Sequence, residues 1–426
     1  MKMLALACCA LSLATASAAP PRATSGDDRS EPAWESKLTI KVGAQAGDIQ
    51  GSSDKAIQAA VDYVARLGGG TVEILPGTYR FRNSVFLASH VRLTGHGKET
   101  VLIKEASSGT VLAQDSDWYD QEITLKDPKG FEIGDGLCLR AKSSPMAIKR
   151  TLVARDGARF KLDRPLRNNV WITGGKDTAT AETLFPILSG EYIEDIVIEN
   201  LTLDGNRDHN ALLDGNYAGC VWLQDCRRVT MRNLDARHYH GDGLSWQICH
   251  DVLVEKCHSH GHTGLGLHPG SGSQRSIIRE CNLEGNDIGI FFCWGVRGGL
   301  AEANTITGNR LGISIGHRDT DNIVRGNTIT GSRQAGILFR PEKDAAAAGH
   351  RNVIERNTLT DNGGDDGAAI KFDAPARGVM LSGNTLKETR GPAKRTGISV
   401  CQGAEDVKIE GNTVQGFATE VSMPGK

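Results

Sequence analysis

The chain has 426 residues, of which 23% are charged and 5% aromatic, and its formal net charge is −2 at pH 7. A near-neutral charge without a Lys/Arg block argues against nucleic-acid binding. The length allows two or three domains, although one long repeat structure can also take up the whole chain.

The N-terminal segment, residues 1–19, is typical of a secretory signal peptide. Met1-Lys2 is followed by a run of small and apolar residues, and Ala16-Ser17-Ala18 forms a cleavage triplet. We expect cleavage near Ala18 or Ala19, a polar leader over residues 20–37, and a secreted or periplasmic protein. No later segment of the sequence is long and apolar enough to span a membrane.

Residues 38–426 are expected to form one β-helix domain. Residues 54–64 have the apolar spacing of an amphipathic helix, and we expect this helix to cap the N-terminal end, where strands would otherwise lie unpaired. Residues 117–170 carry short β-like runs outside the repeat, which indicates a small β insertion. A second insertion runs from residue 206 to 217, and long excursions from a regular scaffold often form the rim of a binding groove.

A short motif of Asn, Thr and an apolar residue recurs along the second half of the chain, with a period of roughly 23 to 30 residues. It begins at Asn304, Asn327, Asn357, Asn384 and Asn412. The fixed period and the alternating β-branched residues predict a solenoid of strands. In stacked coils such Asn side chains can hydrogen-bond their neighbours, which predicts a ladder. A second column reads Gly219, Gly243, Gly264, Gly289, Gly312, Gly336, Ala369 and Gly397.

The predicted helix is followed at residues 68–79 by a segment that contains Gly-Gly-Thr-Val-x-Ile-x-Pro-Gly-Thr-Tyr. Together they resemble the opening of the pectate lyase superfamily, which includes polygalacturonase-like glycoside hydrolases. The resemblance implies an all-β fold, a right-handed parallel β-helix. The motif order is also similar to that of a polygalacturonase. His240-Gly241-Asp242-Gly243 matches the family's Asp-Asp segment with one Asp retained, the segment around His262 resembles the Gly-His-Gly segment, and Ile370-Lys371 is similar to the Arg-Ile-Lys segment.

Histidines gather between residues 238 and 268. Counted from the glycine column, Gln247 and His268 stack, and His262 lies one coil from Asp242. Strand alternation then places several polar side chains on one outer face, with His317 directly after it. We predict that Asp242, His262 and His268 are catalytic. The predicted substrate-binding residues are His238, His240, Gln247, His260, His317, Arg340, Lys371 and Asp373.

These residue types suit the cleavage of a uronic-acid-containing polysaccharide, either by a lyase or by a glycoside hydrolase. For β-elimination, His262 or His268 would serve as the base, while Arg340 and Lys371 would neutralise the sugar carboxylate. Inverting hydrolysis needs two carboxyl groups, and only Asp242 is retained at the matching positions.

The alternative is a non-catalytic β-helix that binds glycans or serves as a surface module. Convergence of the histidines with Asp242 in one groove would favour an enzyme, whereas scattered histidines would favour binding or structure. No cofactor and no metal ligand are predicted. A calcium site would need more carboxylates than Asp242 and Asp373, and a zinc site built from the clustered histidines stays open as an alternative.

Overall fold

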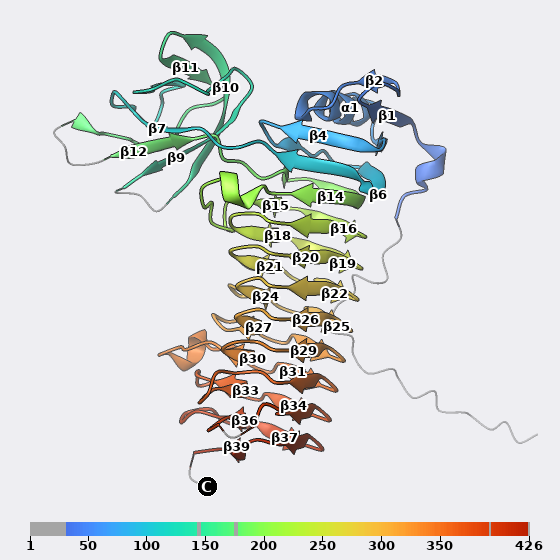
Figure 1. Ribbon diagram of the computed structural model, residues 1–426, viewed down its shortest axis with the longest axis vertical. Helices are drawn as coiled ribbons and strands as arrows, with labels where there is room; N and C mark the ends of the chain where they lie inside the picture. Colours follow the sequence, from blue (N-terminus) through green and yellow to red (C-terminus); the bar gives the residue numbers. More distant parts are fainter. Residues whose placement is uncertain (1–30, 143–145, 174–177, 392, 425–426) are drawn as a thin grey trace, which may run out of the picture.

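The computed structural model describes residues 31–142, 146–173, 178–391 and 393–424, and its strands form a stack of parallel coils (Figure 1). The predicted signal peptide and most of the predicted leader lie outside the described residues. In the rest of the leader Trp34 is buried, and Glu31 forms an ion pair with Arg232 at 2.8 Å. Among the helices of the described residues, none is long and apolar enough to cross a bilayer.

Each regular coil contributes three strands, one to each of three parallel ribbons. Ribbon 1 stacks β16 (Arg227–Arg232), β19 (His250–Glu255), β22 (Ile277–Arg279), β25 (Leu300–Glu302), β28 (Ile323–Arg325), β31 (Val353–Glu355), β34 (Met380–Ser382) and β37 (Lys408–Glu410). Ribbon 2 stacks β17 (Asp235–Arg237), β20 (His258–His260), β23 (Asn282–Glu284), β26 (Thr305–Thr307), β29 (Thr328–Thr330), β32 (Thr358–Thr360), β35 (Thr385–Lys387) and β38 (Thr413–Gln415).

Ribbon 3 runs along the whole solenoid and carries the candidate site. It consists of β5 (Val85–Phe86), β13 (Leu188–Glu191), β15 (Gly219–Gln224), β18 (Asp242–Gln247), β21 (Leu265–Gly270), β24 (Ile288–Phe291), β27 (Leu311–Ile315), β30 (Ala335–Phe339), β33 (Ala368–Phe372), β36 (Thr396–Ser399) and β39 (Thr419–Ser422). Bulky side chains of this ribbon alternate into the coil, where the rings of Phe339 and Phe372 stack with centroids 4.2 Å apart.

At the N-terminal end, α1 (Asp54–Arg66) packs its apolar face, which includes Ile57, Val61 and Val64, against the first strands. These strands are β1 (Thr39–Gly43), β2 (Ile49–Gln50), β3 (Gly70–Ile74), β4 (Gly77–Phe81) and β6 (Val91–Lys104), and β14 (Glu194–Asp204) joins them to ribbons 1 and 2. The helix lies at the residues where the sequence predicts one. Its role as a cap stays a prediction.

A separate antiparallel sheet occupies residues 109–182, a longer segment than the 117–170 range expected from the break in the repeat. Its strands are β7 (Gly109–Val111), β8 (Glu122–Thr124), β9 (Gly136–Ala141), β10 (Ile148–Asp156), β11 (Arg159–Leu162) and β12 (Ala179–Glu182). It has its own apolar cluster, which includes the buried rings of Phe131 and Phe160. We call this sheet the β insertion; Figure 1 shows it beside the N-terminal coils.

The predicted asparagine ladder is confirmed. The Oδ1 atom of Asn327 accepts a hydrogen bond from the backbone N–H of Asn304 at 3.0 Å, and Asn357 accepts one from Asn327 at 2.9 Å. The side-chain Nδ2 of Asn327 donates to the carbonyl of Ala301 at 3.0 Å. Each rung therefore satisfies buried backbone groups at the turn between ribbons 1 and 2.

Candidate functional site

A buried carboxylate–imidazole pair on ribbon 3 is formed by Asp242 and His268, on β18 and β21. The Oδ2 atom of Asp242 lies 2.8 Å from Nδ1 of His268, and both side chains are only 4% exposed. Oδ1 of Asp242 accepts a second hydrogen bond from the backbone N–H of Leu265 at 2.9 Å. Because the carboxylate accepts the proton on Nδ1, the lone pair of the neutral ring lies on Nε2. No hydrogen bond joins Nε2 to any other group among the described residues.

The predicted second insertion, residues 206–217, lies over this pair. Gly215 approaches Asp242 so closely that an added Cβ would lie 1.6 Å from Oδ2. Ser245 donates a hydrogen bond to the carbonyl of Gly215 at 2.7 Å, and Gln247 donates to Ser245 at 3.0 Å. The ring of His240 contacts the same segment, with Nδ1 2.7 Å from the carbonyl oxygen of Asn210. The insertion thus shields the pair from water.

The strand register corrects the predicted stacking of Gln247 with His268. His268 pairs with Ser245, and Gln247 pairs with Gly270. The reason is that Gly266, and not Gly264, lies beneath Gly243, because the turn before β21 has a different length. Asp242 reaches His268 diagonally across the two strands.

The predicted position of His262 in the same groove is wrong. Its ring lies inside the coil, where Nδ1 accepts a hydrogen bond from the backbone N–H of Tyr239 at 3.0 Å and Nε2 lies 3.1 Å from the carbonyl of Ala236. Burial lowers the pKa of His262 to about 3. His262 occupies the turn position that Asn286 and Asn309 fill in the next coils, so it is a member of a second ladder.

Further along the solenoid, directly after β30, the guanidinium of Arg340 binds three groups of the protein itself. Its guanidinium contacts Asp319 at 3.1 Å, the hydroxyl of Ser314 at 2.9 Å and the carbonyl of Phe292 at 2.8 Å. Burial raises the pKa of Asp319 to about 6, although the charge of Arg340 opposes this rise. The same guanidinium lies over the ring of Phe291, whose other neighbour is His268 at 5.3 Å.

The remaining predicted residues fall into separate places. Lys371 pairs with Asp373 at 2.9 Å on the outer face of ribbon 3, and His317 pairs with Glu342. His238 and His260 belong instead to ribbon 2 and its edge, where their rings meet edge-on at 5.7 Å. The structure therefore brings together Asp242, His268 and Gln247, and it separates them from His238 and His260.

A cleft that the sequence interpretation missed lies between the β insertion and ribbon 3. It is open to solvent and has a volume of about 240 Å³. Its lining includes Lys149, Arg150, Arg164, Glu191, Tyr217 and Trp222. Lys149 lies 3.0 Å from the centre of the Trp222 ring and donates to the carbonyl of Tyr217 at 2.7 Å. Burial lowers the pKa of Lys149 to about 7.

Two groups among the described residues have the composition of metal ligands. One consists of Asp235, His258 and His260 on ribbon 2. The other consists of His90, Glu194 and Asp195, but Arg228 already binds both of its carboxylates at 2.6 and 2.7 Å. Only the first group is free of a competing guanidinium at its shared oxygen.

Comparisons with known proteins agree with the architecture. The family model described as right handed beta helix region matches residues 219–347. A search of curated proteins found no match.

Among solved structures, the chain is similar to PfbA, a surface adhesin of Streptococcus pneumoniae, with 14% identity, a TM-score of 0.53 and coverage of 83% of this chain and 79% of that one. It is also similar to the Dettilon tailspike protein, with 11% identity, a TM-score of 0.55 and coverage of 90% and 69%. A glycoside hydrolase shares 12% identity with a TM-score of 0.50 and coverage of 88% and 96%. At these identities the likeness shows the fold alone. The chain therefore has the fold of a right-handed parallel β-helix protein.

Proposed function

We propose that the protein is a secreted enzyme that cleaves a polysaccharide, and that Asp242 and His268 form its proton-transfer pair. The observation that carries this proposal is the 2.8 Å contact between Asp242 Oδ2 and His268 Nδ1. A carboxylate in this position fixes the tautomer of the ring and stabilises its charged form, so that Nε2 can accept a proton from a substrate. Secretion rests on the predicted signal peptide.

The saccharide would enter from the cleft beside the β insertion. Strand pairing places Trp222 next to Ser245, and Ser245 next to His268, in one outward column of ribbon 3. Tyr217 offers an apolar ring surface for a sugar face, while Lys149 and Arg164 offer cations for sugar carboxylates. The cleft and the proton-transfer pair thus lie along one continuous face.

The pair suits β-elimination better than inverting hydrolysis. Inversion needs a second carboxyl group about 6.5–9.5 Å away to activate water, and the pair itself contains only Asp242. In β-elimination, Nε2 of His268 would remove the proton from the carbon next to the sugar carboxylate. The electron pair of that C–H bond forms a carbon–carbon double bond, the glycosidic C–O bond breaks, and the leaving oxygen takes up a proton from solvent.

Glycan binding without cleavage is the second candidate, and one observation favours it. Asp242 and His268 are buried beneath residues 206–217, with only 4% of each side chain exposed, whereas the cleft around Lys149 is open. A binding module would use the cleft alone and would leave the buried pair as a structural contact.

A polysaccharide panel separates these candidates. The purified protein is incubated with neutral and uronic-acid-containing polysaccharides, and ultraviolet absorbance and new reducing ends are followed together. Absorbing products with new reducing ends support the lyase, and reducing ends without absorbance indicate a hydrolase. Retention on a polysaccharide without either product would overturn the enzymatic proposal in favour of binding.

A further inference from the structure

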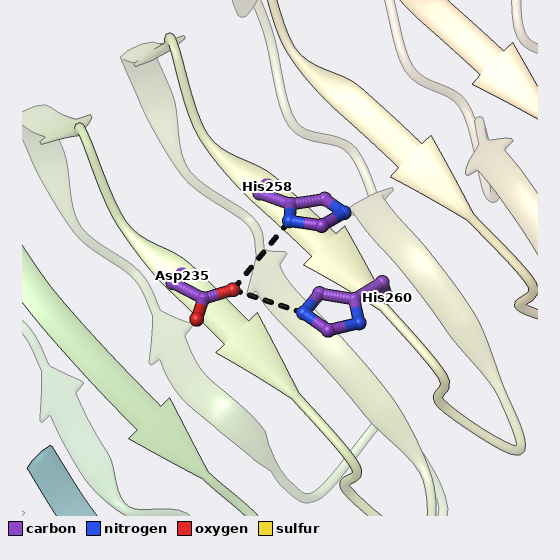
Figure 2. Close-up of side chains that lie close together, drawn as sticks. All are labelled: Asp235, His258 and His260. Atoms are coloured by element: carbon purple, nitrogen blue, oxygen red, sulfur yellow. Dashed lines mark hydrogen bonds and ion pairs between the residues drawn. The ribbon is translucent and has the colours of Figure 1, made fainter. Parts of the chain in front are cut away.

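A cluster of two histidines and one aspartate stands on the outer face of ribbon 2, away from the proposed active site. Figure 2 shows Asp235 on one strand, facing the rings of His258 and His260 on the next. Parallel pairing places Asp235 directly beside His258 and Arg237 beside His260. Ala236 and Ser259, between these residues, are buried in the coil.

The residue types in this cluster depart from the pattern of the ribbon. Along the same two outward columns, three later coils carry only threonine: Thr305 and Thr307, Thr328 and Thr330, and Thr358 and Thr360. Threonine suits an exposed strand surface, and nothing in the packing of these columns requires an imidazole. The change to Asp and His over two adjacent coils concentrates metal-ligand side chains at one point.

The distances fit ligands around one ion. Oδ1 of Asp235 lies 2.9 Å from Nε2 of His260 and 3.6 Å from Nδ1 of His258. The longer separation exceeds a hydrogen bond. Zinc bonds of about 2.0–2.1 Å at tetrahedral angles hold neighbouring ligand atoms about 3.3 Å apart. One ligand atom from each residue lies within 4.8 Å of the other two. The two rings are stacked at 3.9 Å, so one of them must turn for both in-plane lone pairs to point at the same ion.

The second nitrogen of His258 gives independent support. Nε2 of His258 is buried and has no hydrogen-bond partner in the described part of the chain. The nearest carboxylate, Oε2 of Glu284 on the following coil, lies 3.7 Å away. A carboxylate at the outer nitrogen of a histidine is the arrangement that orients metal-bound imidazoles. Arg237 does not fill the site, because it pairs with Asp204 at 2.9 Å and stands 3.5 Å from the other oxygen of Asp235.

We infer that Asp235, His258 and His260 bind a divalent transition ion of the zinc class. Nδ1 of His258, Nε2 of His260 and Oδ1 of Asp235 would be its protein ligands, and Glu284 would orient His258. Two imidazoles and one carboxylate suit zinc, and three protein ligands leave a fourth position for water. An ion held by β17 and β20 would fasten two adjacent coils together, so binding would stabilise the fold.

The test uses the full chain, freed of metal with EDTA and titrated with ZnCl₂ in a calorimeter. We expect one bound equivalent and a rise of the melting temperature with zinc concentration. Glu284→Gln removes a group that only orients a ligand, and should weaken zinc binding by about tenfold. His258→Ala and His260→Ala each remove a ligand, and should weaken binding by more than about 100-fold. The control is His90→Ala, which removes the histidine of the other His–carboxylate group. Arg228 already binds both acids of that group, so this variant should bind zinc like the wild type.

Circular dichroism without zinc checks that the variants fold, and X-ray absorption at the zinc edge identifies the ligands directly. A first shell of two imidazole nitrogens and oxygen supports the inference, even if a variant folds poorly. No saturable zinc binding by the wild type, a sulfur ligand in the absorption spectrum, or wild-type binding by His258→Ala and His260→Ala would overturn it.

Discussion

Asp242 and His268 meet through a diagonal contact between stacked strands, in which Oδ2 lies 2.8 Å from Nδ1 although 26 residues separate the two in sequence. The residue directly beside His268 is Ser245. The contact forms because Asp242 starts β18 while Gly215 leaves room above it. It places an oriented imidazole on the same ribbon as the cleft, which is the basis of the proposed chemistry.

Replacing Asn327 with Leu should destabilise the solenoid. Its Oδ1 accepts hydrogen bonds from both the backbone N–H and the side chain of Asn304, and these donors would be left buried and unpaired. We expect a loss of about 3 kcal/mol in the free energy of unfolding, measured by chemical denaturation. Thr328→Ala, at the exposed neighbouring position, is the control and should change stability little. Equal stability of the two variants would contradict the role of the ladder.

Replacing His262 with Asn should make the protein less sensitive to acid. Burial lowers the pKa of His262 from 6.5 to about 3, so the folded state keeps the ring neutral while the unfolded state takes up a proton below pH 6.5. The stability that depends on the neutral ring is present above pH 6.5 and is lost as the pH falls towards 3. Asn fits the ladder position and does not titrate.

Urea denaturation at pH 7 and pH 5 measures this effect. We expect the wild type to lose about 2 kcal/mol more than His262→Asn between these two values. His90→Asn is the matched control, since it makes the same substitution at a side chain that is 44% exposed and lies outside the ladder. Parallel curves for the wild type and His262→Asn would show that His262 is not buried as a neutral ring.

Binding of an anionic polysaccharide should weaken as the pH rises through 7. Burial lowers the pKa of Lys149 from 10.5 to about 7, so its ammonium group is charged below pH 7 and neutral above it. A charge-assisted contact is worth about 1.5–3 kcal/mol, which corresponds to at least a tenfold loss of affinity between pH 5.5 and pH 8.5. Titration with polyuronate at the two pH values measures it.

Variants of Lys149 test whether this residue causes the pH dependence. Lys149→Arg keeps the charge and should remove most of the pH dependence, and Lys149→Met should bind weakly at both values. Lys129→Met, on an exposed turn of the β insertion, should behave like the wild type. A pH dependence that persists unchanged in Lys149→Met would assign it to another group.

The repeat made much of the fold predictable, because its residues recur with their structural partners. Asn304, Asn327 and Asn357 stand at equal positions in successive coils, so their side-chain contacts followed from the period alone. The glycine column was less reliable, since both Gly264 and Gly266 fit the pattern, and only strand pairing distinguishes them. Aligning Gly243 with Gly264 predicts that Gln247 lies beside His268, whereas Ser245 occupies that position.

The cleft could not be predicted, because its parts belong to different structures. Lys149 comes from the β insertion and contacts Tyr217, 68 residues later, at the end of the second insertion. No period links an insertion to the coil beneath it. The histidine cluster illustrates the same limit: His260, His262 and His268 are close in sequence, yet they face ribbon 2, the coil interior and ribbon 3, since each turn rotates the chain to a new side.

The most direct test of the proposed function is the turnover of Asp242→Asn on the polysaccharide that the wild type degrades. Loss of an oriented base should lower kcat by about 10²–10⁴-fold, while binding in the cleft and the circular dichroism spectrum stay unchanged. Asp321→Asn, an exposed carboxylate paired with Arg351, is the matched control and should keep wild-type activity. Wild-type kcat in Asp242→Asn would contradict the assignment of Asp242 and His268 as the proton-transfer pair.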